Sequence, residues 1–160
     1  MELAHNDNNT KQLDLRSRLV EEGAIFRTSS DSEILVHLIA KSRHETVDAQ
    51  IDDALTHLEG AYSIVLCVGE TIYAVRDPRG FRPLVLGKLG DKTIVTSETC
   101  ALDILGAEYI RDMEPGEVIK IRDGQVKRLR SLPPAEQPSP CIFELVYFAR
   151  PDSRIWGQSV

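Results

Sequence analysis

Apolar residues recur at helical spacing in the first third of the chain. The spacing predicts a helix over residues 10–22 and another over residues 47–58. Between them, Ser30 and Glu33 stand at capping-box spacing before a second predicted helix that carries Ile34, Leu35, Leu38 and Ile39. Residues 3–4 resemble the end of a strand, and the polar residues 5–9 predict a turn.

Beyond Gly60 the pattern changes to short apolar, β-branched runs that predict strands. They cover residues 61–68, 71–75, 83–86, 92–96, 118–121 and 126–129, with a short helix over 100–105. The first run is apolar throughout, which suits a strand buried on both faces. Helices first and strands afterwards favour an α+β fold, with the helices segregated on a largely antiparallel sheet.

A proline-rich stretch interrupts this pattern near the end of the sequence. Residues 131–140 hold four of the eight prolines and show no periodicity, which predicts an extended connector. The apolar segment CIFELVYFARPDS follows it. We therefore predict one domain over residues 1–130, and over residues 131–160 a linker with the start of another domain.

Composition narrows the class of protein. The 160 residues are 42% hydrophobic, enough for one core, and the net charge of −6 argues against a nucleic-acid binder. No apolar run approaches the ~20 residues of a membrane span, and no secretory signal pattern occurs, so a cytoplasmic protein is expected. The three cysteines lie far apart, which indicates reduced thiols rather than a disulfide framework.

Three polar stretches carry candidate chemistry. In the stretch HNDN, Asn6 and a neighbouring backbone N–H could converge as in an oxyanion hole, while an ordinary turn before a helix fits the same residues. The stretch TSSDSE is typical of a helix cap. Between Arg76 and Arg82 four charged residues crowd a Gly/Pro-rich turn, which suits either an anion site or an ion-paired turn with Asp77 and Glu98 as partners.

Together these stretches resemble the glutaminase domain of amidophosphoribosyltransferases. The resemblance rests on AVRDPRGFRPLVLG, VTSETCALDILG, RDMEPGE and the late FARPDS, in that order, and it runs from Ala4 to about Val160. It implies a partial α+β sandwich of the N-terminal-nucleophile class. The parent enzyme would transfer ammonia from glutamine to phosphoribosyl diphosphate, giving 5-phosphoribosylamine in the first step of purine synthesis.

The resemblance also implies roles for single residues. Asn6 would donate to the oxyanion, and Asp7 stands where the family has Gly, so its carboxylate would oppose the developing charge and weaken the glutaminase. Asp31 matches the residue that binds the α-amino group of glutamine. The arginine-rich turn would be architectural. Cys141 matches an iron–sulfur ligand of some members, although one thiolate cannot hold a cluster that needs about four.

The family's N-terminal cysteine nucleophile has no counterpart in these residues, so we expect a fragment that is inactive alone. Mg²⁺ and any iron–sulfur cluster would belong to the parent enzyme, with no cofactor for this chain by itself. The expected partners are glutamine and, in the parent, phosphoribosyl diphosphate and further copies in a homo-oligomer, without nucleic acid or membrane. Two alternatives remain: a non-catalytic remnant that binds glutamine or pairs with a full-length subunit, and another class II amidotransferase.

Overall fold

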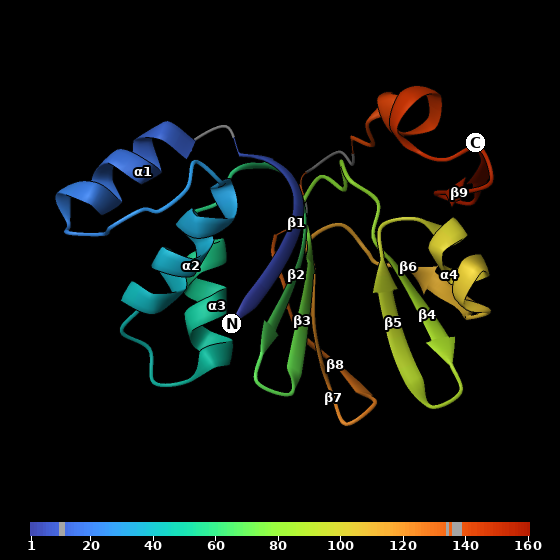
Figure 1. Ribbon diagram of the computed structural model, residues 1–160, viewed down its shortest axis with the longest axis horizontal. Helices are drawn as coiled ribbons and strands as arrows, with labels where there is room; N and C mark the ends of the chain where they lie inside the picture. Colours follow the sequence, from blue (N-terminus) through green and yellow to red (C-terminus); the bar gives the residue numbers. More distant parts are fainter. Residues whose placement is uncertain (10–11, 134, 136–138) are drawn as a thin grey trace. The chain divides into compact units, whose positions relative to one another are not determined.

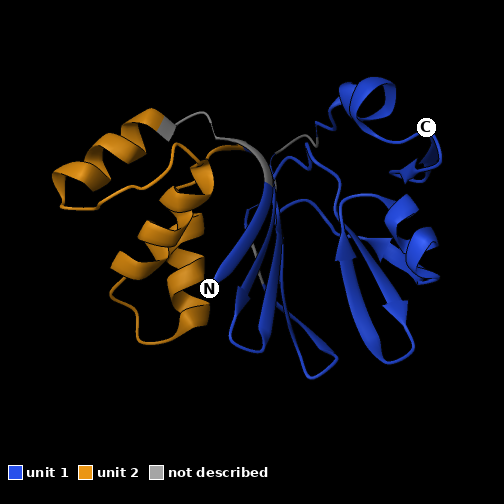
Figure 2. Cartoon of the chain, in the orientation of Figure 1, with its two compact units in different colours: residues 1–6, 61–160 blue, residues 7–60 orange. Residues whose placement is uncertain are grey.

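A computed structural model describes residues 1–9, 12–133, 135 and 139–160 (Figure 1). The chain divides into two compact units (Figure 2). One unit comprises residues 1–6 and 61–160, and the other comprises residues 7–60. We describe each unit by itself and call them the sheet unit and the helical unit.

The helical unit contains the three helices that the apolar spacing predicts. They are α1 (Gln12–Glu21), α2 (Asp31–Lys41) and α3 (Val47–Leu55). Their apolar faces are buried, and Leu19, Ile34 and Ala54 are at most 1% exposed. Helix α3 ends three residues before the predicted position, and Thr10, the predicted start of α1, lies outside the described residues. The three-helix prediction is therefore confirmed.

The predicted capping box at α2 is wrong. The Ser30 side chain caps no helical N–H and instead contacts the Ser32 hydroxyl at 2.8 Å. The Glu33 carboxylate accepts the backbone N–H groups of Arg27 at 2.8 Å and Thr28 at 2.9 Å. These bonds lower the pKa of Glu33, because they favour its charged form. The carboxylate therefore fixes the loop that leads into the helix rather than closing the helix end itself.

Two of the sheets in the sheet unit form its main body, with one short α-helix beside them. The larger sheet has the strand order β1-β2-β3-β7-β8, and the smaller has the order β5-β4-β6. The first comprises β1 (Glu2–Asn9), β2 (Gly60–Val68), β3 (Thr71–Arg76), β7 (Glu117–Arg122) and β8 (Gln125–Ser131). The second comprises β4 (Val85–Leu89), β5 (Lys92–Thr96) and β6 (Glu108–Asp112), with α4 (Thr99–Leu105) beside it. The pairs β2–β3, β3–β7, β7–β8, β4–β5 and β4–β6 are antiparallel.

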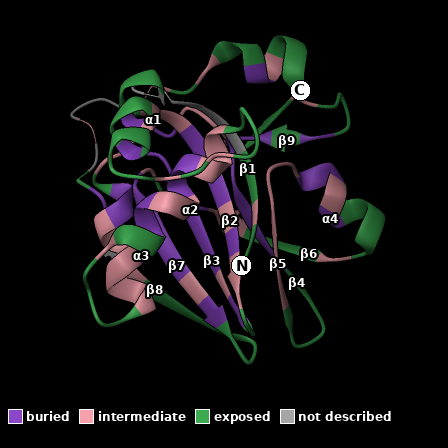
Figure 3. Cartoon of the chain, turned by 60° about the vertical axis from the view of Figure 1, so that its left-hand side comes forward, coloured by how far each residue is buried: buried purple, intermediate pink, exposed green. Residues whose placement is uncertain are grey.

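The core of this unit joins the two sheets. Ala74 of β3 and Ile119 of β7 belong to one buried cluster with Leu86 of β4, and all three are at most 3% exposed. Figure 3 shows that buried residues concentrate along β2, β3 and β7. Strand β2 buries three consecutive residues, Tyr62 to Ile64, so both of its faces are covered there as expected. Helices and antiparallel strands confirm the α+β prediction.

Several boundaries differ from the sequence prediction. Residues 5–9 continue β1 instead of turning, because strand pairing uses the backbone and an edge strand tolerates polar side chains. Strand β4 begins at Val85 rather than at Pro83, which has no N–H to give to a ladder. Strand β6 was not predicted, since its residues from Glu108 to Ile110 are exposed and leave no buried alternation.

The apolar segment after the proline-rich stretch forms η1 (Glu144–Phe148), a π-helical turn. A small hairpin of β9 (Arg154–Ile155) and β10 (Gln158–Ser159) follows it. Most large side chains of this segment face outward: Ile142, Phe143, Val146, Tyr147 and Phe148 are each more than half exposed. Within the described residues, no helix has the length and apolar character needed to cross a bilayer.

The start of β7 holds a buried carboxylate that makes the sheet unit sensitive to acid. Glu117 is 1% exposed. Its carboxylate accepts a hydrogen bond from each terminal nitrogen of Arg111, both at 2.7 Å, and one from the backbone N–H of Glu114 at 2.8 Å. Burial opposes its charge, but the Arg111 fork and the Glu114 N–H outweigh burial and lower the pKa of Glu117. The charged form therefore stabilises the fold above the unfolded pKa of about 4.3.

We expect Glu117→Gln to destabilise the protein by about 1–3 kcal/mol at pH 7, because the charge-assisted bonds are lost. The wild type loses this contribution as pH falls from about 4.3 through the lower folded pKa, so the difference between variant and wild type shrinks toward pH 3. Urea unfolding, followed by fluorescence of the single tryptophan, Trp156, measures the free energy of unfolding of variant and wild type at each pH. Glu114→Gln is the control, because its pair with Arg128 is exposed. A difference that stays constant from pH 7 to pH 3 would contradict the assignment.

Candidate functional site

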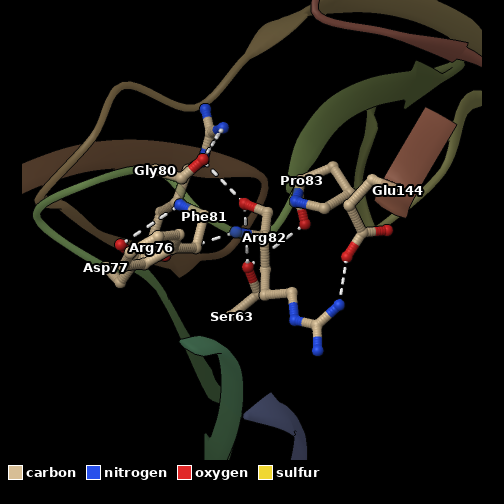
Figure 4. A network of polar contacts seen from close by, with 8 residues as sticks. All are labelled: Ser63, Arg76, Asp77, Gly80, Phe81, Arg82, Pro83 and Glu144. Atoms are coloured by element: carbon tan, nitrogen blue, oxygen red, sulfur yellow. Dashed lines mark hydrogen bonds and ion pairs between the residues drawn. The ribbon is translucent and has the colours of Figure 1, made fainter. Parts of the chain in front are cut away.

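The arginine-rich turn after β3 is built around a buried guanidinium. Arg76 is 4% exposed. It donates to the carbonyl oxygens of Arg82 at 2.9 Å and Gly80 at 3.1 Å (Figure 4). It also donates to the carbonyl oxygen of Met113. Burial lowers the pKa of Arg76, opposed by the nearby charges, Asp112 first among them. Because its donors already hold backbone carbonyls, this arginine is a structural centre of the loop rather than a site for an anion.

Asp77 holds the same loop from the other side. It is fully buried, and its carboxylate accepts the N–H groups of Arg79 at 2.8 Å, Phe81 at 3.2 Å and Arg82 at 3.4 Å. Its backbone N–H donates to the Tyr62 carbonyl on β2 at 2.9 Å. Burial raises the pKa of Tyr62, and the Asp77 charge adds to this shift. The architectural role expected of this turn fits these contacts.

Gly80 allows the loop to close around Arg76. It has φ +65°, a conformation that favours glycine. A Cβ there would lie 3.0 Å from Pro115 Cγ and 3.3 Å from the Arg76 guanidinium. A side chain would therefore be strained and would press on the buried arginine.

The expected pairing of the turn with Glu98 is wrong. Glu98 accepts the backbone N–H of Arg150 and the hydroxyl of Ser153, both at 2.8 Å. The turn instead forms an ion pair between Arg82 and Glu144 of η1. Sequence spacing could not predict this, because 62 positions separate the two residues.

A cavity of about 340 Å³ lies beside the loop in the sheet unit. It is lined by Ala4, His5, Ser63, Val65, Leu84, Val95, Thr96 and Ser97. The Ser63 hydroxyl donates to the carbonyl oxygen of Pro83 at 3.1 Å, so one wall of the cavity is bonded directly to the arginine-rich loop. His5 immediately precedes Asn6 in β1. The cavity therefore joins the loop to the strand that carries the candidate oxyanion residues.

The structure places the predicted site residues in separate parts of the chain. Asn6 and Asp7 belong to β1, but their side chains lie outside what the structure describes, so their oxyanion role stays a prediction. Asp31 is the first residue of α2 in the helical unit, partly buried, where the positive end of the helix dipole stabilises a carboxylate. Cys141 lies in the sheet unit, just before η1.

Cys141 is half-buried, and its N–H donates to the Phe81 carbonyl at 3.4 Å. In the part of the chain that the structure describes, no group of three or more His, Cys, Asp or Glu residues could hold a metal ion. An iron–sulfur cluster takes about four ligands, so the described residues do not fit one.

Sequence reasoning missed two residues of this region, Ser63 and Glu144. Ser63 gave no signal, because a serine in an apolar strand is unremarkable. Glu144 did: it is the single carboxylate inside the apolar run CIFELVYF and is 4% exposed as a side chain. A charge that is buried in such a run requires a cation, which here is Arg82.

A profile described as "Glutamine amidotransferase domain" matches residues 2–103. The chain belongs to this glutamine amidotransferase family. The matched residues include β1, the helical unit and the whole arginine-rich turn.

Known relatives of this glutamine amidotransferase domain extend the match to the whole chain. It is 47% identical to the amidophosphoribosyltransferase of Rhizobium etli, over 99% of this chain and 33% of the relative. It is 44% identical to that of Bacillus subtilis, again over 99% of this chain and 33% of the relative. The solved glutamine phosphoribosylpyrophosphate amidotransferase of B. subtilis, in complex with ADP and GMP, has a TM-score of 0.88 and 42% identity, covering 97% of this chain and 34% of that one. The likeness confirms the N-terminal-nucleophile fold expected from the resemblance.

The chain spans about a third, 33%, of the length of these curated relatives. The match therefore shows a glutamine amidotransferase domain, while the activity of a whole enzyme is a proposal.

The loop contacts predict a large effect for a small substitution. We expect Asp77→Asn to destabilise the sheet unit by about 1–3 kcal/mol. The amide oxygen can still accept the N–H groups of Arg79 and Phe81, which share Oδ1, but the amide nitrogen cannot accept the Arg82 N–H at the Oδ2 position, and the buried charge is lost. Urea unfolding followed by Trp156 fluorescence measures the change at constant m-value. Asp91→Asn, in an exposed hairpin of the same unit, is the control and should change little. A loss below about 1 kcal/mol for Asp77→Asn would refute this role.

Proposed function

We propose that this chain is part of an amidophosphoribosyltransferase. Identity of 44% and 47% to two such enzymes over 99% of the chain is the observation that carries the proposal. The whole enzyme would hydrolyse the side-chain amide of glutamine to glutamate and ammonia. The ammonia would then attack C1 of phosphoribosyl diphosphate and displace pyrophosphate, giving 5-phosphoribosylamine for purine synthesis. The class II alternatives gain no support from these relatives.

Asn6 and Asp31 are the residues of this chain that we assign to glutamine chemistry. The Asn6 amide would donate to the oxygen that becomes negative when the glutamine amide carbon turns tetrahedral. The Asp31 carboxylate would hold the α-ammonium group of glutamine by a charge-assisted hydrogen bond. Both assignments come from the matching motifs. The position of Asp31 at the start of α2 supports a charged carboxylate there.

The thiol nucleophile is not assigned within these residues. Cys67 lies in β2, Cys100 is buried in α4, and Cys141 precedes η1. We therefore propose that the 160 residues alone do not release ammonia from glutamine. Mg²⁺, which neutralises charge on a diphosphate, belongs to the whole enzyme in this proposal, as do a homo-oligomeric state and a cytoplasmic location.

Glutamine binding tests Asp31. We expect Asp31→Asn to weaken glutamine binding about 10- to 100-fold in calorimetric titration of the 160-residue chain, because it removes one charge-assisted bond. N-acetylglutamine, which lacks the ammonium group, should bind wild type and variant equally. Asp14→Asn, at the start of α1 in the same unit, is the matched control. Equal glutamine affinity for Asp31→Asn and wild type would remove Asp31 from the site.

A chimaera tests Asp7 and the glutaminase assignment together. Replacing the matching third of the B. subtilis enzyme with this chain should give a protein that releases glutamate slowly, because the Asp7 carboxylate opposes the oxyanion. Asp7→Gly should raise the rate about 10²-fold, and Asn6→Ala should lower it by a similar factor. An Asp7→Gly chimaera no faster than its parent would contradict the role of this position, and glutamate release insensitive to Asn6→Ala would contradict the oxyanion assignment.

A further inference from the structure

Three described residues before η1 are hydrogen-bonded through their backbone to the arginine-rich loop. Three N–H groups of the segment donate to three carbonyl oxygens of the loop, in the same order along both: Ala135 to Pro78 at 3.1 Å, Ser139 to Arg79 at 2.9 Å and Cys141 to Phe81 at 3.4 Å. The loop therefore supplies the acceptors that hold these three residues beside it.

The next contact in this series is the ion pair between Arg82 and Glu144. The side chains are 18% and 4% exposed, and the Arg82 guanidinium also lies over the Phe148 ring, 5.0 Å from its centroid. A carboxylate buried this far is costly without a cation. Because most large apolar side chains around Glu144 face outward, apolar burial holds this turn only weakly. The ion pair is thus the main side-chain attachment of η1 to the loop.

Arg82 connects this attachment to the cavity through its backbone. Its carbonyl oxygen accepts from Arg76 Nε at 2.9 Å and from the Ser63 hydroxyl at 3.4 Å (Figure 4). The single hydroxyl proton is shared with the Pro83 carbonyl oxygen, which lies nearer at 3.1 Å, and Ser63 lines the cavity that also contains His5. One residue therefore faces Glu144 with its side chain and Ser63 with its carbonyl group.

We propose that Arg82 and Glu144 are positioning residues that couple the seating of η1 to the Ser63 wall of the cavity beside His5. When the pair is intact, the Arg82 side chain is held on η1 and its carbonyl stays in reach of Ser63. When Glu144 loses its charge, Arg82 turns toward solvent, the loop carbonyls shift and the cavity wall moves. The consequence for glutamine chemistry rests on the proposed function, because His5 adjoins Asn6, but the coupling itself does not.

The far end of the segment has its own anchor, which keeps the expected effect local. Thr99 accepts the N–H of Arg154 at 2.8 Å, and Glu98 accepts from Arg150 and Ser153. These bonds attach the β9–β10 hairpin to the start of α4. Loss of the Arg82–Glu144 pair should therefore free η1 and Cys141 while the hairpin stays in place.

The cysteines provide the first measurement. In the 160-residue chain, Glu144→Gln should raise the alkylation rate of Cys141 by N-ethylmaleimide about tenfold or more, resolved by peptide mass spectrometry. Cys100, 5% exposed in α4, reports global opening and should keep its wild-type rate. Asp152→Asn is the matched control, because it removes an exposed ion pair with Arg150 on the same segment and should leave Cys141 unchanged. An unchanged Cys141 rate in Glu144→Gln overturns the proposal.

The histidines provide the second measurement. His5 belongs to the sheet unit, whereas His37, His44 and His57 belong to the helical unit and act as internal references. Glu144→Gln should shift the NMR resonance of the His5 imidazole and leave the other three in place. Faster Cys141 labelling with an unmoved His5 resonance overturns the coupling, because η1 would then be seated independently of the cavity.

A charge-swapped variant keeps the test decisive if Glu144→Gln unfolds and Cys100 also becomes reactive. Arg82→Glu combined with Glu144→Arg should return Cys141 labelling to within about threefold of wild type and restore the His5 resonance. A swap that restores neither overturns the proposal. None of these readouts uses glutamine, so they stand or fall separately from the proposed function.

Discussion

The buried charges of Arg76 and Asp77 are the constraint on which the sheet unit depends. Both residues are at most 4% exposed, and both spend their hydrogen-bonding capacity on the backbone of the loop that follows them. Arg76 donates hydrogen bonds to carbonyl groups of the loop, and Asp77 accepts hydrogen bonds from its N–H groups. Together the two side chains satisfy polar backbone groups of both kinds in one short stretch of chain. These bonds favour one overall course of the loop backbone, because a large rearrangement would leave a buried charge without partners.

That fixed loop lets residues far apart in sequence meet. Ser63 reaches it from β2, the Met113 carbonyl reaches it from beyond β6, and Glu144 reaches it from η1. The two sheets share a core on one side of it, and the cavity beside His5 lies on another. The arginine-rich turn, which resembles an anion site in the sequence, therefore connects β2, the chain beyond β6 and η1. The polar groups of Arg76 and Asp77 are directed inward, toward the backbone of the loop.

Strand pairing and the proposed chemistry make different demands on Asp7, the residue that stands where the resemblance expects glycine. The family is that of glutamine amidotransferase domains, and in the proposed oxyanion site an aspartate at position 7 would work against stabilising negative charge. Fold and chemistry are thus separable here. Backbone pairing holds β1 in the sheet whatever the side chain at position 7, whereas the proposed oxyanion stabilisation would depend on that side chain.

Local pattern by itself determined the three helices, most strands and the α+β class, because apolar periodicity records which faces are buried. Motif order by itself determined the family and the candidates Asn6, Asp7, Asp31 and Cys141. Only the tertiary structure decided that residues 5–9 extend a strand, that Glu33 holds a loop instead of closing a capping box, and that Arg82 pairs with Glu144 rather than Glu98. The physical reason is range: periodicity and capping act over a few residues, whereas the partner of a buried charge is chosen by what the fold brings beside it.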